Sequence, residues 1–288
     1  MAGKAFSYTA ALLLSLSAST VHAYVFVIDE FRIERSFGCV LVDSFNSGGP
    51  PPSSPNFCSG NTASYSTQGT FGPESGGKLI IDSANALLAT NAAGAARLVH
   101  NATSLTNVNP LAPFNLGIRK DDTFKVSAIY DLITPPSPIS GYGIRLTDRT
   151  QYPSASLAND DLSLQLFTDT GGSTYVRLAS QDFSLGTITE WEQVGFLAPL
   201  GADQIEFMFS HTNPADSLIT SSFRYLSGGS VIAGSEYTLA TQVEVFRGED
   251  FIRAGIQAFT AVPAPGSLAL LAVGLLSLLR CGGRRRAV

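Results

Sequence analysis

Short runs of alternating apolar and polar residues, separated by clusters of turn formers, limit most strongly what this chain can fold into. The apolar members of four such runs are Phe124, Val126, Ala128 and Tyr130; Leu162, Leu164 and Leu166; Ile205, Phe207 and Phe209; and Val243 and Val245. A period of two residues predicts β-strands with one buried face. No convincing helical periodicity extends beyond two turns.

Further strands are expected at 25–31, 39–45, 64–71, 78–82, 97–100, 142–147, 174–179, 191–197, 223–226 and 251–259. Turn clusters such as Thr170-Gly171-Gly172 and Ser227-Gly228-Gly229 separate several of them. About fourteen short strands without a dividing linker predict one all-β domain over residues 24–261, built as an antiparallel β-sandwich of two stacked sheets.

The N-terminus has the pattern of a secretory signal peptide. Lys4 precedes an apolar stretch over residues 10–16, and Val21-His22-Ala23 forms a small-residue cleavage site. We expect signal peptidase to remove residues 1–23, so that the mature chain begins at Tyr24. The alternative is an uncleaved N-terminal anchor, which the short apolar stretch disfavours.

The C-terminus combines three features in a fixed order. Val262-Pro263-Ala264-Pro265 comes first, an apolar stretch over residues 266–279 follows, and Arg284-Arg285-Arg286 lies near the end. Arginines resist translocation, so we expect a transmembrane helix with a cytoplasmic basic tail and an exported chain upstream. The stretch is shorter than the about 17–25 residues of a usual span.

This tail resembles the PEP-CTERM sorting signal of Gram-negative bacteria that make extracellular polysaccharide. In that family a Val-Pro-Glu-Pro motif precedes a short transmembrane helix and a basic end. The resemblance covers residues 262–286 and implies processing by an exosortase, a membrane protease-transpeptidase. Ala264 stands where the family usually has Glu. Cleavage of the tail therefore stays open, and a plain membrane anchor is the alternative.

The charge of the exported part bears on its partners. Five of the 18 basic residues lie in the two terminal segments and all 23 acidic residues lie between them, which leaves 13 minus 23, or −10. An acidic surface argues against nucleic acid and anionic membrane surfaces as partners.

Two of the three cysteines, Cys39 and Cys58, lie in the exported part, and Cys281 lies beside the terminal arginines. An oxidising compartment favours a Cys39–Cys58 disulfide, and two free thiols are the alternative. The disulfide would close a loop of about 20 residues and contribute on the order of 3 kcal/mol.

Several short motifs resemble concanavalin A-like, laminin-G-like jelly rolls over residues 40–260. They are Val42-Asp43-Ser44-Phe45, Gly76-Gly77-Lys78-Leu79, Tyr142-Gly143-Ile144-Arg145-Leu146 and the loop Asn159-Asp160-Asp161. The resemblance implies a sandwich that binds carbohydrate or protein. Folds of this kind host many unrelated functions, so the motifs alone do not assign one.

No catalytic constellation is evident. A hydrolase on such a scaffold would use two carboxylates about 5–10 Å apart. The nearest pair is Glu190 and Glu192, which a regular strand would place on one face beside Trp191. No third acid is in step with them, so we interpret both as solvated strand residues and expect no enzyme activity. No nucleophile motif and no zinc-ligand spacing occur.

Calcium is the one metal ion that the sequence leaves open. Asp148, Asn159, Asp160, Asp161 and Asp169 supply oxygen ligands near two loops. Ordinary turn chemistry accounts for the same residues and is preferred, so no metal site is assigned. Tyr142, Asp148, Asn159, Asp160, Asp161 and Trp191 are the candidate ligand-binding residues. Their aromatic rings could stack on sugars, although core packing is the default expectation for Trp191.

Together these features predict a protein exported across the inner membrane to the cell envelope, outer surface or extracellular matrix. We expect a non-catalytic binding or adhesion module, with signal peptidase and an exosortase as processing partners and extracellular polysaccharide or envelope components as ligands. The alternatives are a carbohydrate-active hydrolase on the same β-sandwich and an unprocessed membrane-anchored surface protein.

Overall fold

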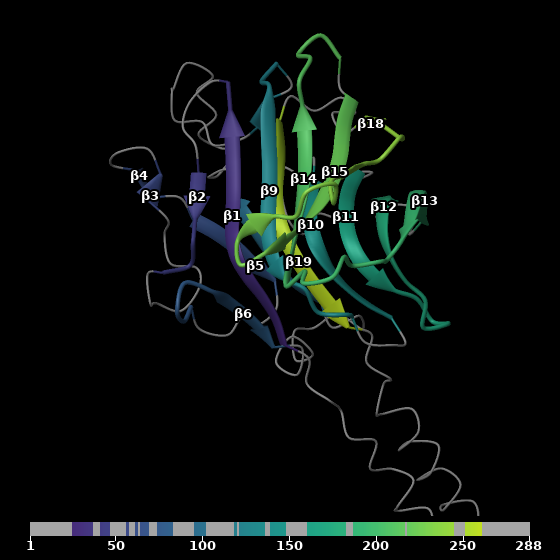
Figure 1. Cartoon of the computed structure of the whole chain (residues 1–288). Helices are drawn as coiled ribbons and strands as arrows, with labels where there is room; N and C mark the ends of the chain where they lie inside the picture. Colours follow the sequence, from purple (N-terminus) through teal and green to yellow (C-terminus); the bar gives the residue numbers. More distant parts are fainter. Residues whose placement is uncertain are drawn as a thin grey trace, which may run out of the picture. The chain divides into compact units, whose positions relative to one another are not determined.

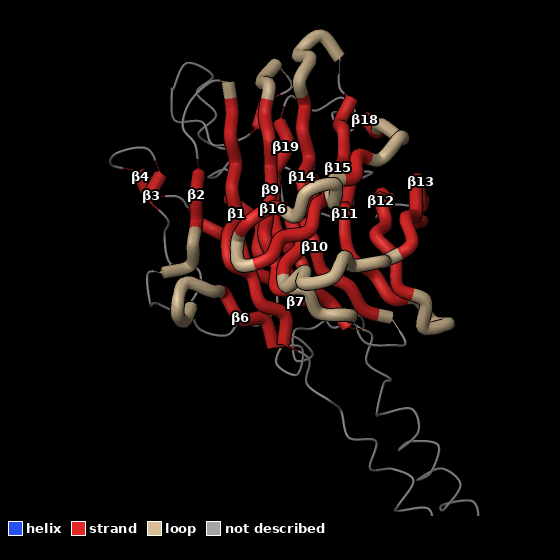
Figure 2. Tube along the Cα trace, viewed as in Figure 1, coloured by secondary structure: helices blue, strands red, loops and turns tan. Residues whose placement is uncertain are grey.

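The alternation of side chains along the sequence becomes an alternation between the two sides of antiparallel sheets. The computed structural model describes residues 25–36, 41–46, 56–57, 61–62, 64–68, 74–82, 95–101, 118–119, 121–135, 139–147, 160–182, 187–216, 218–244 and 251–260. Within these ranges lie nineteen strands and no helix (Figure 2). The predicted all-β class is confirmed. The Cys39–Cys58 disulfide, the signal peptide and the C-terminal helix lie outside the described residues.

The first sheet, called sheet 1, contains nine strands. They are β1 (Val25–Arg35), β2 (Leu41–Asp43), β6 (Leu79–Asp82), β9 (Phe124–Asp131), β14 (Gln204–His211), β15 (Leu218–Ser227), β16 (Ser230–Val231), β17 (Tyr237–Thr238) and β18 (Val243–Glu244). The order is β16-β15-β14-β9-β1-β2, with β17 and β18 paired to β15 and β6 paired to β1.

The second sheet, called sheet 2, contains eight strands. They are β5 (Ser64–Gln68), β7 (Ala95–Asn101), β8 (Ile118–Arg119), β10 (Ser140–Thr147), β11 (Asp160–Thr168), β12 (Thr174–Asp182), β13 (Thr187–Gly195) and β19 (Phe251–Thr260). The order is β13-β12-β11-β10-β19-β7-β5, with β8 paired to β19. A small hairpin of β3 (Asn56–Phe57) and β4 (Asn61–Thr62) stands apart from both sheets (Figure 1).

The core lies between the inner faces of the two sheets and joins them through aromatic rings. Tyr130 of sheet 1 and Tyr142 of sheet 2 have ring centroids 5.0 Å apart, and Phe26 lies 5.3 Å from Tyr142. The Tyr130 hydroxyl donates to the carbonyl of Gly143 at 2.6 Å, so a buried polar group is satisfied across the sandwich. Burial raises the pKa of the Tyr130 hydroxyl well above its ordinary value.

The apolar members of the alternating runs fill this core where the side chains are described. Phe124, Val126, Ala128, Tyr130, Leu162, Leu164, Leu166, Ile205, Phe207, Phe209 and Val243 are all buried. The inner faces predicted from the period of two residues are therefore confirmed. Every sheet pairing among the described strands is antiparallel, as expected of a sandwich with short connections.

Two local motifs behave as their residue types require. Ser227-Gly228-Gly229 closes the hairpin between β15 and β16, and both glycines have positive φ, 54° and 79°, as a two-residue hairpin turn of this hand demands. In the Asp43-Ser44-Phe45 motif, the Asp43 carboxylate accepts the backbone N–H of Phe45 at 2.9 Å. That turn holds Phe45 at φ 49° and places its ring in the core.

Candidate functional site

The outer face of sheet 2 carries polar and aromatic side chains where a solvent-facing sheet would be expected. Because Tyr142, Ile144 and Leu146 point into the core, the residues between them on β10 point outward. The same alternation applies to β11 and β12. The described outward residues of the three strands are Gly141, Gly143, Arg145, Thr147, Asp161, Ser163, Gln165, Phe167, Tyr175, Arg177 and Ala179.

This face is buried across its centre. Arg145, Asp161, Gln165 and Arg177 are exposed by only 4%, 4%, 2% and 8%. We call these four residues the polar layer. Charged and amide side chains are rarely buried to this degree unless their hydrogen-bonding groups are satisfied. The hydrogen bonds of each member therefore decide what the layer can do.

Arg145 and Asp161 form an ion pair through one contact only. Arg145 Nη2 donates to Asp161 Oδ2, whereas Arg145 Nε and Asp161 Oδ1 have no hydrogen-bond partner. A guanidinium and a carboxylate can pair through two parallel hydrogen bonds. Here the second donor and the second acceptor are buried without a partner.

Gln165 faces Gly143 of β10 and Arg177 of β12 in the strand register, and Ser163 faces Arg145. Its amide Nε2 donates to the Ser163 hydroxyl at 3.0 Å, and that hydroxyl donates to the Ala179 carbonyl at 3.2 Å. The amide oxygen of Gln165 is buried without a partner. The layer therefore contains a second open acceptor.

Arg177 connects the polar layer to aromatic rings and to a more exposed carboxylate. Its guanidinium carbon lies 3.4 Å from the centroid of the Phe167 ring, and Nη1 donates to Glu190 Oε1 at 2.8 Å. Burial lowers the pKa of the Arg177 guanidinium, and the hydrogen bond to Glu190 opposes that shift. Arg177 Nε has no partner, so it is the second open donor.

Aromatic rings line the next outward row of the same face. Phe167 packs against Tyr175 at 5.6 Å and against Phe259 at 6.1 Å between centroids. The Phe167 ring is nearly buried, whereas Tyr175 is half-buried. Residues on β13, including Glu190, Gln193 and Gly195, are exposed. Exposure thus increases across the face from β10 toward β13.

The pair Glu190 and Glu192 does not share a face, which corrects the expectation from the sequence. The pairing of β12 with β13 shifts register, so that Leu178 faces Glu192 and Ala179 faces Glu190, with Trp191 as the extra residue of a β-bulge. Glu190 bonds Arg177 and Gln193 on the outer face. Glu192 instead accepts the backbone N–H of Thr241 at 2.9 Å.

Trp191 and Tyr142, the two candidate sugar-stacking rings, lie in different environments. Trp191 is 39% exposed, and its indole N–H donates to the Ser180 hydroxyl at 2.9 Å, so it is not a core residue. Tyr142 is 1% exposed, and its hydroxyl accepts the backbone N–H of Ile133 at 3.1 Å. Its ring belongs to the core between the sheets, where it cannot stack on a ligand.

The candidate calcium ligands are not brought together where they are described. Asp161 lies near the start of β11 and is paired with Arg145, whereas Asp169 follows the end of β11 and accepts the Ser173 backbone N–H at 2.9 Å. They are eight residue steps apart along an extended strand that rises about 3.3 Å per residue. No group of three potential metal ligands occurs in the described part of the chain.

The remaining candidate residues cannot be placed in the same detail. Asp148, Asn159, Cys39, Cys58 and the sorting residues Val262, Pro263, Ala264, Pro265, Arg284, Arg285 and Arg286 lie outside the described residues. Asp160 belongs to β11, but its side chain is not described.

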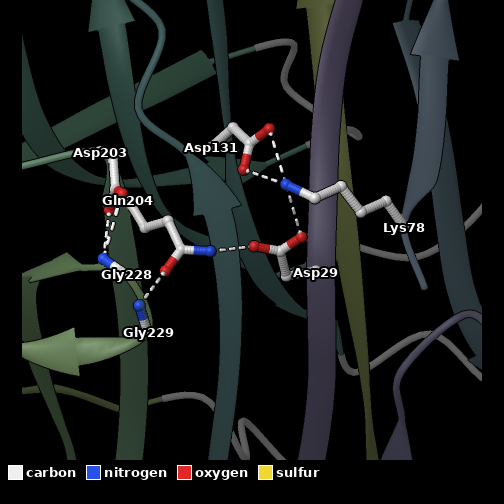
Figure 3. Close-up of polar contacts among 7 residues, drawn as sticks. All are labelled: Asp29, Lys78, Asp131, Asp203, Gln204, Gly228 and Gly229. Atoms are coloured by element: carbon white, nitrogen blue, oxygen red, sulfur yellow. Dashed lines mark hydrogen bonds and ion pairs between the residues drawn. The ribbon is translucent and has the colours of Figure 1, made fainter. Parts of the chain in front are cut away.

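A second polar cluster, which the sequence did not reveal, crosses one end of sheet 1 (Figure 3). Lys78 Nζ contacts Asp29 at 3.0 Å and Asp131 at 2.8 Å, and Gln204 Nε2 donates to Asp29. The backbone N–H of Gly229 donates to Gln204 Oε1 at 3.2 Å. These contacts join β1, β9, β14, the residue before β6 and the turn before β16. These polar groups bond to one another across four strands, so the cluster fastens this end of the sheet.

Sequence reasoning also missed Arg145, Gln165 and Arg177. Their alternation with buried aliphatic residues marks them as outward-facing, and an outward polar residue in a strand is normally interpreted as solvated. No feature of a single sequence distinguishes an outward residue in water from an outward residue that is buried.

None of the described residues belongs to a helix long and apolar enough to span a bilayer. Comparison of the chain with protein-family models, with curated proteins and with solved structures gives no match. The site must therefore be interpreted from its own geometry.

Proposed function

We propose that this protein is an exported binding module of the cell envelope or extracellular matrix, which binds polysaccharide without cleaving it. Its terminal segments support the export, because a signal-peptide pattern precedes residue 24 and the PEP-CTERM-like tail follows residue 261. In this proposal an exosortase recognises the tail, and the β-sandwich is a jelly roll of the concanavalin A-like type.

The observation that carries the binding role is the polar layer with its aromatic neighbours on the outer face of sheet 2. Both described carboxylates of this face, Asp161 and Glu190, form ion pairs with arginines. A retaining or inverting glycosidase needs one carboxyl group to deliver a proton and a second to attack or to activate water. Both carboxylates are already engaged by guanidinium groups, and no further acidic side chain is described on this face, which favours binding over hydrolysis.

Retention and turnover should be measured on the same protein. We expect the purified full-length chain in detergent to be retained on at least one immobilised polysaccharide and to release no new reducing ends from it. Retention together with turnover that is lost in Glu190→Gln would support the alternative of a hydrolase. Absence of retention on every polysaccharide would contradict the binding function.

The sorting role has a separate test in a host that contains an exosortase. We expect pulse-chase labelling to show loss of the tail from the envelope form, and replacement of Arg284, Arg285 and Arg286 by serine to alter localisation or processing. Replacement of the same three residues by lysine preserves the charge and is the matched control. Indefinite retention of Arg286 in the wild type would support a plain membrane anchor.

A further inference from the structure

Two leucines project into solvent from the connection between β13 and β14. Leu197 and Leu200 are 86% and 103% exposed, the highest values among the large apolar side chains that the structure describes as exposed. Single exposed apolar residues are common on soluble proteins and need no explanation. Two leucines that are almost fully exposed on one short connection form a candidate contact point, and the position of that connection decides what it could contact.

The connection is anchored, so it holds the two leucines outward. Phe196, Ala198 and Ala202 pack against the core, and the Phe196 ring centroid lies 6.3 Å from that of Tyr225. The backbone N–H of Ala202 donates to the carbonyl of Pro199 at 3.1 Å, which closes a turn around the second leucine. The apolar side chains are therefore displayed by a packed turn.

This connection lies at the end of the sandwich where β19 ends. The backbone N–H of Phe196 donates to the Thr174 carbonyl at 3.3 Å. Thr174 pairs with Thr168, Thr168 with Ser140, and Ser140 with Thr260, the last residue of β19. The connection and the end of β19 are therefore level with each other and about 19 Å apart, because four strand spacings separate β13 from β19. The strand β1 also begins at this end (Figure 1).

The proposed membrane tail limits how far this end of the sandwich can be from a bilayer. Only residues 261–265 separate Thr260 from the apolar stretch at 266–279. Five residues reach at most about 18 Å when fully extended. In the unprocessed chain, the end of β19 therefore stays within that distance of the bilayer, and a tilt of the domain suffices to bring the two leucines to the lipid.

The chemistry of the connection fits an uncharged lipid boundary. Asp203 is the only charged residue within 196–203, and its carboxylate accepts the backbone N–H of Gly228 at 3.0 Å. Apolar side chains bind the headgroup boundary through the area they bury, whereas attraction to anionic lipids needs basic residues. The connection between β14 and β15, at the opposite end of the sandwich, spans residues 212–217 and contains no large apolar residue.

We propose that Leu197 and Leu200 form a second membrane contact, inserted into the outer headgroup boundary of the bilayer that the tail spans. A second contact joined to the first by a short link forms intramolecularly, so it needs little affinity of its own. It fixes the orientation of the sandwich on the membrane until the tail is removed. This inference rests on the membrane tail of the proposed function and adds a lipid contact made by the domain itself.

The test places a fluorescent indole at the contact and at a matched distant site. Trp191, the only tryptophan, is first replaced by phenylalanine. Leu200→Trp and Leu197→Trp then report on the connection. Ile188→Trp is the control, because Ile188 is also exposed, at 55%, and lies toward the other end of β13. Each full-length variant is reconstituted into phosphatidylcholine vesicles that contain lipids brominated near the headgroup, and circular dichroism checks that it is folded.

Bromine quenches an indole only on contact, so the loss of fluorescence reports insertion. We expect both reporters on the connection to shift their emission to shorter wavelength and to lose most of their intensity in the brominated vesicles. The Ile188→Trp control should change little. Addition of Leu197→Ser to the Leu200→Trp variant should reduce the quenching, because half of the apolar contact is removed.

The outcomes separate the contact from the tail. Flotation of the chain with the vesicles, without quenching on the connection, would overturn the contact and leave the tail standing. Equal quenching at the control site would reveal unspecific adsorption and would also overturn it. A shift without quenching, seen only in envelope membranes, would assign the leucines to a protein partner instead of lipid. Failure of the chain to float would contradict the membrane tail and this contact together.

Discussion

The outer faces of the two sheets use the same residue types in opposite ways. On sheet 1, Arg32 contacts Glu30 at 3.0 Å and Glu34 at 3.2 Å, and its side chain is 37% exposed. On sheet 2, Arg145 and Arg177 each have one carboxylate partner, and their side chains are only 5% and 10% exposed. Each keeps an open Nε.

This difference separates a solvated face from a buried polar face. Where water reaches a charged residue, water molecules can satisfy its hydrogen-bonding groups. Each ion pair there contributes little to stability. Where burial excludes water, a donor or acceptor without a partner carries its full desolvation cost, and each remaining contact matters more. The physical environment, more than the residue types, makes sheet 2 the functional candidate.

The largest predicted contrast comes from breaking one ion pair on each face. Asp161→Ala leaves the buried Arg145 guanidinium without its carboxylate and should lower the free energy of unfolding by about 3–5 kcal/mol. Glu34→Ala on sheet 1 should cost about 0–1 kcal/mol. Urea denaturation of the two variants measures both. Similar losses in the two would show that burial does not distinguish the faces.

A second contrast concerns how tightly the strands of sheet 2 pack beneath the polar layer. A Cβ at Gly143 would lie 2.1 Å from the Leu164 carbonyl oxygen, so Gly143→Ala should destabilise the protein by about 2–3 kcal/mol. A Cβ at Gly195 would meet nothing within 4 Å. Gly195→Ala should change stability by about 0.5 kcal/mol or less, as thermal melting of both variants can show.

A third contrast uses pH to weaken the contacts of Lys78 on sheet 1. The hydrogen bond to Asp131 and, less strongly, the one to Asp29 raise the pKa of the Lys78 ammonium above its ordinary value of 10.5, against some desolvation. A raised pKa in the folded state means that the contribution is complete below pH 10.5 and is lost as pH rises through the folded value. Arginine does not titrate in this range.

Urea denaturation of the wild type and of Lys78→Arg from pH 9 to 11.5 isolates that contribution, because all other titrating groups are shared. We expect the wild type to lose more stability than the variant above pH 10.5. The effect should be modest, since the Lys78 side chain is 40% exposed. Parallel curves for the two proteins would show that Lys78 does not hold the end of sheet 1.

The smallest predicted contrast is the response to salt. The coupling energy between Arg32 and Glu34, from a double-mutant cycle, should be below about 1 kcal/mol at low salt and should approach zero in 1 M NaCl. The coupling between Arg145 and Asp161 should change much less, because counterions do not reach a buried pair. Equal salt sensitivity of both couplings would contradict the burial of the polar layer.

Particular residues show how far the sequence alone could predict this structure. The alternation of Phe124, Val126, Ala128 and Tyr130 correctly predicted an inner face, because a period of two residues matches a half-buried strand and does not match a helix. The bulge at Trp191 was not predictable, since the insertion of one residue appears only in the pairing with β12. It moved Glu192 away from Glu190 and exposed the indole ring.

The candidate site was largely hidden from the sequence for a related reason. Asp161 was singled out as a loop acid, but its partner Arg145 lies 16 positions earlier and on another strand. Lys78 and Asp131, 53 positions apart, meet in the same unforeseen way. Side-chain pairs across a sheet depend on register, which a single sequence with short, degenerate motifs leaves undetermined.

The most direct test of the contrast between the two faces is hydrogen–deuterium exchange of the full-length chain with and without a polysaccharide on which it is retained. We expect slower exchange on binding in β11 and β12, residues 160–182, with no change in β1 or β14 of sheet 1. Protection confined to sheet 1, or no protection within 160–182 at saturating polysaccharide, would contradict it.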